Sequence, residues 1–294
     1  MAETDAMTAR APAAAFLLTL SCADRIGIVA EVASFLTRHG CNIVESAQYG
    51  DPESGRFFLR TGFAPTADAT LAELAQAFDP IAQRFGMDAR FRDARRKLPT
   101  LIMVSRLGHC LNDLLFRWRI GALPIEVRAV ASNHLDFEDL VAAAGVPFHH
   151  LPLSVETKPA QEAALEALIE RAGVELVVLA RYMQVLSPGF CARHAGRIIN
   201  IHHSFLPSFV GARPYHAAHR RGVKLIGATA HYVTEDLDEG PIIEQAVERV
   251  DHTMTVADYI AAGRDVEAQV LARAVKWHAE SRVLLNGART VVFH

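Results

Sequence analysis

The sequence predicts an α/β protein in which a doubly wound, mainly parallel sheet is preceded by a smaller α+β domain. Two observations predict this class. Up to residue 92 the pattern runs strand, helix, strand, strand, helix, strand, and from Thr100 strands alternate with helices. A charged stretch broken by proline separates the two patterns, as is typical of a linker. We expect four parts: a disordered leader over 1–14, a first domain over 15–92, a linker over 93–99 and a second domain over 100–294.

The first domain has the element order of a ferredoxin-like unit. Apolar runs and an amphipathic pattern predict its elements, and Gly40 is expected to end the first helix. The predicted strands cover 16–21, 41–49, 56–63 and 87–92, and the helices cover 28–39 and 71–85. The apolar run that opens the first strand is short, and acidic Glu3 and Asp5 precede it, so we favour a strand over a secretory signal.

The second domain alternates buried strands with helices. Its predicted strands begin with 101–105, 125–132, 148–153, 176–180 and the run from Ile198, and its helices cover 111–118, 136–144, 160–172 and 187–194. Ser187 and Pro188 suit the start of the last of these helices. Two further strands over 225–233 and 241–250 and one or two helices over 255–285 complete the expected fold.

Composition excludes several classes of protein. The net charge of −3 gives no electrostatic argument for nucleic acid or an anionic membrane as partner. No apolar run approaches the roughly 20 residues of a membrane span. The four cysteines are scattered and form no C-x-x-C pair, which fits a reducing compartment, the cytoplasm, and argues against a disulfide scaffold or zinc ribbon.

The first candidate for chemistry is the run from Ile198 to Pro207. Alternation along a strand places Asn200 and His202 on one face and His203 on the opposite one. A buried amide and imidazole each need a hydrogen-bond partner, or each costs about 1–3 kcal/mol. The C-terminal edge of a parallel sheet is where α/β enzymes bind ligands, so this pair predicts a site there.

The second candidate is the acidic loop between His231 and Pro241. Asp238 stands out because Gly240 and Pro241 constrain the chain just beyond it. Asn200, His202 and Asp238 together suit acyl transfer: an amide stabilises an oxyanion, an imidazole moves a proton and a carboxylate orients the imidazole. The sequence has no G-x-S-x-G nucleophile motif, so water or an amine is expected to attack directly.

A metal site is the alternative interpretation of these side chains. Adjacent strand residues face opposite ways, so the neighbouring histidines are not expected to bind one ion, and H-E-x-x-H is absent. We expect no metal.

Four segments of the second domain resemble the formyltetrahydrofolate hydrolase and transferase family: 200–209, 211–215, 227–233 and 237–243. The resemblance implies a formyltransferase-like domain whose catalytic residues are Asn200, His202 and Asp238. It also implies a supporting role for His231, alongside which we place His203 and Gly240. Met183, Gln184, Val185 and Leu186, in a segment similar to the family's pterin-binding loop, are expected to bind the folate substrate. No separate cofactor is implied.

The first domain resembles the ACT domain, chiefly in its element order and in Gly27 at the start of its first helix. This resemblance implies either an amino-acid effector site or a module used only for oligomerisation. A homo-oligomer is expected in both cases.

The loop from Ser105 to Asp113 distinguishes the possible acceptors. Its single Gly108 is followed by bulky residues, which makes a poor phosphate cradle, and 109–115 resembles the hydrolytic branch of the family. We therefore predict hydrolysis of 10-formyltetrahydrofolate to formate and tetrahydrofolate, which would supply formate for purine synthesis and balance the one-carbon folate pool. The alternatives are formyl transfer to an amine and a non-catalytic folate or amino-acid sensor.

Overall fold

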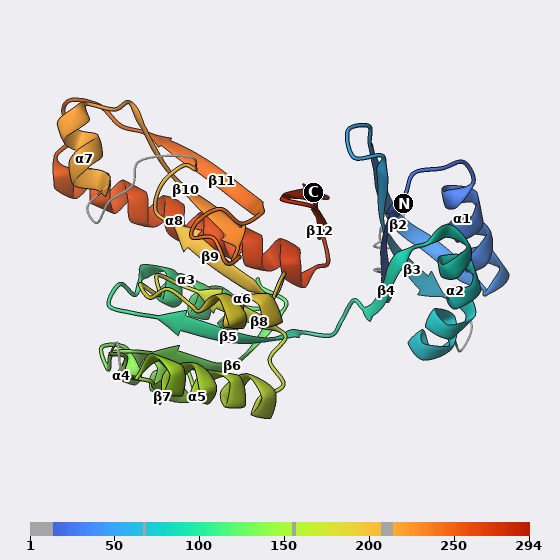
Figure 1. Ribbon diagram of the computed structural model, residues 1–294, viewed down its shortest axis with the longest axis horizontal. Coiled ribbons are helices and arrows are strands. Elements are labelled where there is room, and N and C mark those ends of the chain that lie inside the picture. Colours follow the sequence, from blue (N-terminus) through green and yellow to red (C-terminus); the bar gives the residue numbers. More distant parts are fainter. Residues whose placement is uncertain (1–13, 67–68, 155–156, 207–213) are drawn as a thin grey trace, which may run out of the picture. The chain divides into compact units, whose positions relative to one another are not determined.

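The computed structural model describes residues 14–66, 69–154, 157–206 and 214–294. The chain divides into two compact units, 1–96 and 97–292. The leader expected over 1–14 lies outside the described residues except for Ala14. Figure 1 shows the elements of each unit coloured along the chain.

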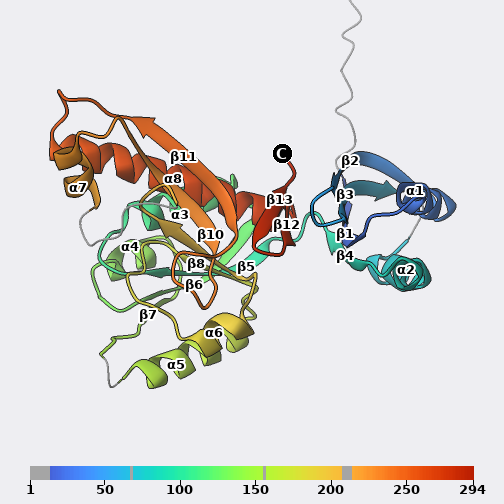
Figure 2. The ribbon, with the colours of Figure 1, turned by 45° about the horizontal axis from the view of Figure 1, so that its top comes forward.

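The first unit is a four-stranded antiparallel sheet in the order β2-β3-β1-β4, with both helices packed on one face (Figure 2). Leu18, Phe35, Phe63 and Phe78 are among the residues that fill the core between the sheet and the helices. This is the predicted ferredoxin-like order. The elements are β1 (Phe16–Ala23), α1 (Ile28–Arg38), β2 (Cys41–Asp51), β3 (Arg56–Pro65), α2 (Leu71–Phe85) and β4 (Asp88–Asp93).

The helix ends of the first unit are specified locally. Gly40 follows α1 with a left-handed φ of 65°, as predicted from its position. Thr70 begins α2 with a capping box, in which its side chain accepts the N–H of Glu73 and the Glu73 carboxylate accepts the N–H of Thr70. Gly86 ends that helix in the left-handed region.

The second unit is built on a seven-stranded sheet in the order β11-β10-β9-β8-β5-β6-β7. The five strands from β9 to β7 pair in parallel, and β10 and β11 pair antiparallel. The mainly parallel sheet confirms the predicted fold class. The strands are β5 (Leu98–Val104), β6 (Ile125–Ser132), β7 (Phe148–His150), β8 (Leu176–Leu179), β9 (Ile198–His202), β10 (Leu225–Tyr232) and β11 (Ile242–Arg249).

Helices cover both faces of this sheet. One hydrophobic core joins α3, α4 and α8 to the sheet, and a second joins α5 and α6 to it. Ser187 caps α6 by accepting the N–H of Phe190, with Pro188 in the first turn, as predicted. The helices are α3 (His109–Arg119), α4 (Glu138–Ala143), α5 (Lys158–Arg171), α6 (Pro188–Arg193), α7 (Pro214–Arg221) and α8 (Val256–Ala279).

Among the boundaries that differ from the predictions, two lie at the beginning and near the end of the second unit. The connection between the units is shorter than the predicted linker, because β4 extends to Asp93 and β5 begins at Leu98. Pro99 is tolerated there because it stands at the start of a strand. The last helix ends at Ala279 rather than near residue 285, since Ser281 adopts a left-handed φ of 54°. A hairpin follows, formed by β12 (Val283–Asn286) and β13 (Arg289–Val292).

Among the helices that the structure describes, none has both the length and the apolar character needed to cross a membrane.

Candidate active site

The predicted catalytic residues meet at the C-terminal edge of the parallel strands. Asn200 and His202 lie on β9, which pairs with β8 on one side and β10 on the other (Figure 1). Loops after β8 and β10 complete a pocket of about 730 Å³ at this edge, a volume typical of small-molecule sites. All ten predicted site residues line it: Met183, Gln184, Val185, Leu186, Asn200, His202, His203, His231, Asp238 and Gly240.

Asp238 and His202 form a close pair. His202 Nδ1 lies 3.0 Å from Asp238 Oδ2. The hydrogen bond from His202, and after it the nearby His231 imidazole, hold the pKa of Asp238 well below its usual range, against the opposing effect of burial. Asp238 therefore stays ionised at neutral pH and favours the His202 tautomer that carries its proton on Nδ1.

His231 links Asn200 to the same carboxylate. Its Nδ1 donates to the backbone carbonyl of Tyr232 at 2.9 Å, which leaves Nε2 to accept the amide N–H of Asn200 at 3.2 Å. Nε2 also lies 3.6 Å from Asp238 Oδ1, so a second proton on His231 would be shared with Asp238. One N–H of the Asn200 amide is used by His231, and the other is left for a ligand.

Gly240 and the backbone of Asp238 shape the acidic loop. A Cβ on residue 240 would lie 1.7 Å from the carbonyl oxygen of Tyr232, so only glycine fits. The N–H of Tyr232 donates to the carbonyl of Pro241 at 2.9 Å, which ties the end of the loop to β10. Asp238 has a left-handed φ of 59°, a conformation that costs energy in a non-glycine residue and is often found at functional sites.

The loop after β8 presents apolar side chains to the pocket. Met183 and Val185 of this loop, and Leu237 of the loop after β10, are each more than half exposed although they are large and apolar. The N–H of Met183 donates to Ser105 Oγ at 3.0 Å, which holds the loop against the end of β5. Exposed apolar groups that converge on one cavity mark a binding surface for an apolar or flat ligand.

The prediction that His203 faces away from Asn200 and His202 is wrong. Strand β9 ends at His202, so alternation does not extend to the next residue. The His203 ring instead stacks on the His202 ring, with centroids 4.8 Å apart and an interplanar angle of 22°, and it lines the same pocket. Burial and the nearby charges of Arg181 and His202 lower the pKa of His203 to about 4, so it is neutral at pH 7.

Sequence reasoning missed a buried charged cluster next to His203. It consists of Arg181, Glu267, His109 and Tyr215, and Glu267 is only 1% exposed. A signal was present in the sequence: the buried stripe of α8 includes Tyr259, Gly263, Val266 and Val270, and Glu267 falls on that stripe. An acid on the buried face of an amphipathic helix needs partners from elsewhere.

Among the described residues, the ligand atoms of His109, Cys110 and Glu267 lie within 4.8 Å of one another. Donors already surround the Glu267 carboxylate, however. His109 and Tyr215 hydrogen-bond to its two oxygens, and the Arg181 guanidinium stands beside it. Burial raises the pKa of the Cys110 thiol far above its usual range. This cluster is therefore neutralised by protein cations and protons rather than arranged for an ion.

Residues 99–275 match the formyl transferase family model, and residues 16–79 match the ACT domain model. A formyltetrahydrofolate deformylase from Corynebacterium sp. (strain P-1) is 56% identical over 277 residues, which cover 94% of this chain and 97% of the relative. The chain belongs to the formyltetrahydrofolate deformylase family. A second family member, from Bacillus subtilis (strain 168), is 48% identical over 279 residues and covers 94% and 93% of the two chains.

Solved structures agree with this family membership. The formyltetrahydrofolate deformylase from Burkholderia mallei superposes with a TM-score of 0.93 at 55% identity, over 96% of this chain and all of that one. The phosphoribosylglycinamide formyltransferase from Coxiella burnetii gives a TM-score of 0.62 at 29% identity, over 67% of this chain and 93% of the other. The deformylases thus match both units, whereas the transferase matches a portion of about two thirds.

Proposed function

We propose that this protein hydrolyses 10-formyltetrahydrofolate to formate and tetrahydrofolate. The observation that carries the proposal is the convergence of Asn200, His202 and Asp238 on one pocket beside an exposed apolar loop. The relatives that match nearly the whole chain are named for deformylation of formyltetrahydrofolate. The formate released would serve purine synthesis and would balance the one-carbon folate pool.

The proposed reaction is direct attack by water on the formyl carbon. His202, with its proton on Nδ1, uses Nε2 to take a proton from water while Asp238 holds the imidazole and stabilises the cation that forms. The free N–H of Asn200 stabilises the oxyanion. The bond between the formyl carbon and N10 then breaks, and the proton passes to N10, so the sum is formate plus tetrahydrofolate.

The folate ring system would bind on the apolar side chains of the loops after β8 and β10. Met183, Val185 and Leu237 offer the exposed apolar surface, and the buried Leu186 side chain also lines the pocket. Gln184 also lines the pocket and offers a neutral amide to the folate. No further cofactor enters this scheme, and full turnover after dialysis against a chelator is the expected result.

The test of the function is incubation of the purified protein with 10-formyltetrahydrofolate while formate is followed. An Asp238→Asn variant is expected to lose formate release and to keep folate binding, because it leaves His202 without an ionised partner. Full activity in that variant would contradict the mechanism. Binding of folate by the unchanged protein without any formate release would instead support a sensor.

Transfer of the formyl group to an amine is the second candidate, favoured by the similarity to phosphoribosylglycinamide formyltransferase. Candidate amines are added to the same assay. Formyl groups that accumulate on an amine rather than as formate would establish transfer, and an unchanged yield of formate would establish hydrolysis.

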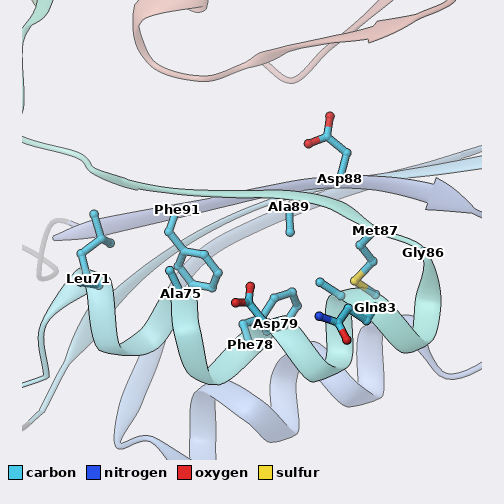
Figure 3. A pocket seen from close by; sticks show the side chains of 12 residues that line it. Leu71, Ala75, Phe78, Asp79, Gln83, Gly86, Met87, Asp88, Ala89 and Phe91 are labelled. Atoms are coloured by element: carbon cyan, nitrogen blue, oxygen red, sulfur yellow. The ribbon is translucent and has the colours of Figure 1, made fainter.

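We further propose that the ACT domain binds an amino-acid effector. A pocket of about 700 Å³ lies between α2 and β4 and is lined by apolar residues such as Phe91 and Met87 (Figure 3). Asp79 of α2 also lines it and could pair with an ammonium group. The test is calorimetric titration of the full chain with single amino acids. If Asp79 is the anchor, binding should be lost in Asp79→Asn but kept in Asp24→Asn, an exposed control that does not line the pocket.

We also propose a cytoplasmic location. The four cysteines are all free and buried, as suits a reducing compartment.

A further inference from the structure

The buried cluster around Glu267 has no part in the chemistry proposed above. His109 Nε2 lies 2.7 Å from one carboxylate oxygen, and the Tyr215 hydroxyl donates to the other at 2.6 Å. Arg181 Nε lies 3.4 Å from the first oxygen. Burial raises the pKa of Glu267, but the His109 hydrogen bond, the Arg181 charge and the Tyr215 hydrogen bond outweigh it, so the group is ionised.

The cluster reaches the reaction pocket through His203. The His203 ring lies between the His202 ring, 4.8 Å away, and the Tyr215 ring, 6.5 Å away. Arg181 lines the pocket together with His203. The Glu267 cluster therefore comes close to His203 through the Tyr215 ring and Arg181, and His203 in turn stacks on the imidazole that faces Asp238.

Each member of the cluster is tightly placed. Arg181 adopts a left-handed φ of 63°, which a non-glycine residue keeps only where its surroundings hold it. Gly263 lies one turn before Glu267 on α8, and a Cβ there would lie 2.2 Å from the Tyr215 ring. Tyr215 thus packs directly on the helix that carries the carboxylate. A buried carboxylate that lost one of its donors would be strongly destabilised, which favours this one arrangement.

The charge state of the His203 ring matters for proton uptake by the His202 ring on which it stacks. The charged and titratable groups that face it are Arg181 after β8, His202 on β9, Asp238 in the loop after β10 and Glu267 on α8, with Tyr215 of α7 beside them. Burial and Arg181 disfavour its protonated form, while Glu267 and Asp238 favour it. A positive charge on His203 would oppose proton uptake by the stacked His202.

We propose that Glu267 is a positioning residue: by anchoring Tyr215 and Arg181 it holds the His203 ring flat against His202, and so fixes the imidazole that takes the proton from water. This inference rests on the hydrolytic function proposed above. Its test uses the full chain and compares Glu267→Gln with the unchanged protein.

Glu166→Gln is the matched control. Glu166 accepts from His194 at 2.8 Å and pairs with Arg193 at 2.7 Å, so it also joins a histidine and an arginine, but it lies on α5 and does not line the pocket. Formate release is measured as a function of pH and substrate concentration for each protein. Formate release by the unchanged protein tests the function itself and is scored separately.

Glu267→Gln is expected to lower kcat roughly ten- to a hundred-fold, the scale of a misplaced catalytic group, with KM little changed. The acid limb of its pH profile should move toward neutral pH, because a released and more solvated His203 regains a pKa near its ordinary value of about 6.5. Glu166→Gln should change neither kcat nor the acid limb.

His203→Phe shows whether the effect passes through His203, since phenylalanine keeps a flat ring that cannot ionise. On that background Glu267→Gln should no longer move the acid limb, and the losses in kcat should not multiply. If Glu267→Gln does not fold, Tyr215→Phe replaces it, with a smaller loss of kcat expected for the same reason.

An unshifted acid limb, unchanged kcat, or the same shift in the His203→Phe background would overturn the inference. None of these results would affect the proposed hydrolysis, which depends only on formate release by the unchanged protein.

Discussion

At the scale of single residues, the proposed mechanism gives a separate role to each of the two N–H groups of the Asn200 amide. One is donated to His231 at 3.2 Å, and the other is available to the oxyanion. Alanine would remove both, while the backbone of β9 would keep its pairing with β8 and β10.

We predict that Asn200→Ala lowers kcat by about 10²–10³-fold, the usual cost of losing one oxyanion donor. The loop proposed to bind the folate is untouched, so KM should change much less. Steady-state formate release measures both constants. Asn42→Ala, on the exposed face of β2, serves as the control and should behave as the unchanged protein. A wild-type kcat in Asn200→Ala would exclude the proposed role.

A second prediction at the residue scale concerns His203 and the way in which the free energy of unfolding depends on pH. Its folded-state pKa is about 4, below the ordinary value of about 6.5 expected in the unfolded chain. Between these values the unfolded state binds a proton that the folded state does not. The free energy of unfolding should therefore decrease as the pH falls from about 6.5 toward 4. Above that range the contribution from His203 should be fully present.

Denaturant unfolding at a series of pH values measures this effect. His203→Phe removes the ionisable group, so its free energy of unfolding should fall less steeply over the same interval. Equal slopes for the two proteins would show that His203 is not held neutral in the folded state.

At the scale of elements, the turn from β10 into β11 places Asp238. The carbonyl of Tyr232 comes so close to residue 240 that no side chain fits, and the Tyr232 N–H bonds back to Pro241. The Asp238 carboxylate is therefore positioned by two strand ends and a glycine rather than by its own packing.

We predict that Gly240→Ala forces the turn apart, with a destabilisation of about 1–3 kcal/mol or more, as in other overpacked sites. It should also lower kcat, since Asp238 would move relative to His202. Thermal unfolding and formate release check the two effects. Gly189→Ala is the control, because its Cβ would come no closer than 3.4 Å to an Arg193 side-chain nitrogen. Normal stability and turnover in Gly240→Ala would contradict this account.

At the scale of the whole molecule, the sheet of the first unit ends at two edges, β2 and β4, that no strand of the described residues pairs with. Strand edges are ready to pair with another chain unless they are blocked. β2 also exposes Ile43 and Tyr49, large apolar side chains that a partner would cover.

We predict a homo-oligomer that forms through the first unit. Light scattering coupled to size exclusion should give a mass above the 32.2 kDa of one chain. Ile43→Asp is expected to shift the population toward monomer, because a charge would be buried in the contact. Lys97→Asp, outside the first unit's sheet, is the control. A monomer at all concentrations would contradict the prediction.

The sequence by itself determined the order of the elements and the residues that we propose for the chemistry. Strand alternation placed Asn200 and His202 on one face, and glycine with proline beyond Asp238 marked the loop that meets them. Both are local signals, because the spacing of apolar residues and the choice of turn residues involve only a few neighbouring positions. They can therefore be recognised in the sequence before the fold is known.

Only the tertiary structure decided which side His203 takes and what surrounds Glu267. The end of β9 at His202 depends on where its neighbouring strands stop pairing, which alternation does not reveal. His109 and Glu267 are 158 residues apart in the chain and meet because α3 and α8 pack on the same face of the sheet. Tertiary packing decides which residues contact a buried charge, so no local sequence pattern could predict the partners of Glu267.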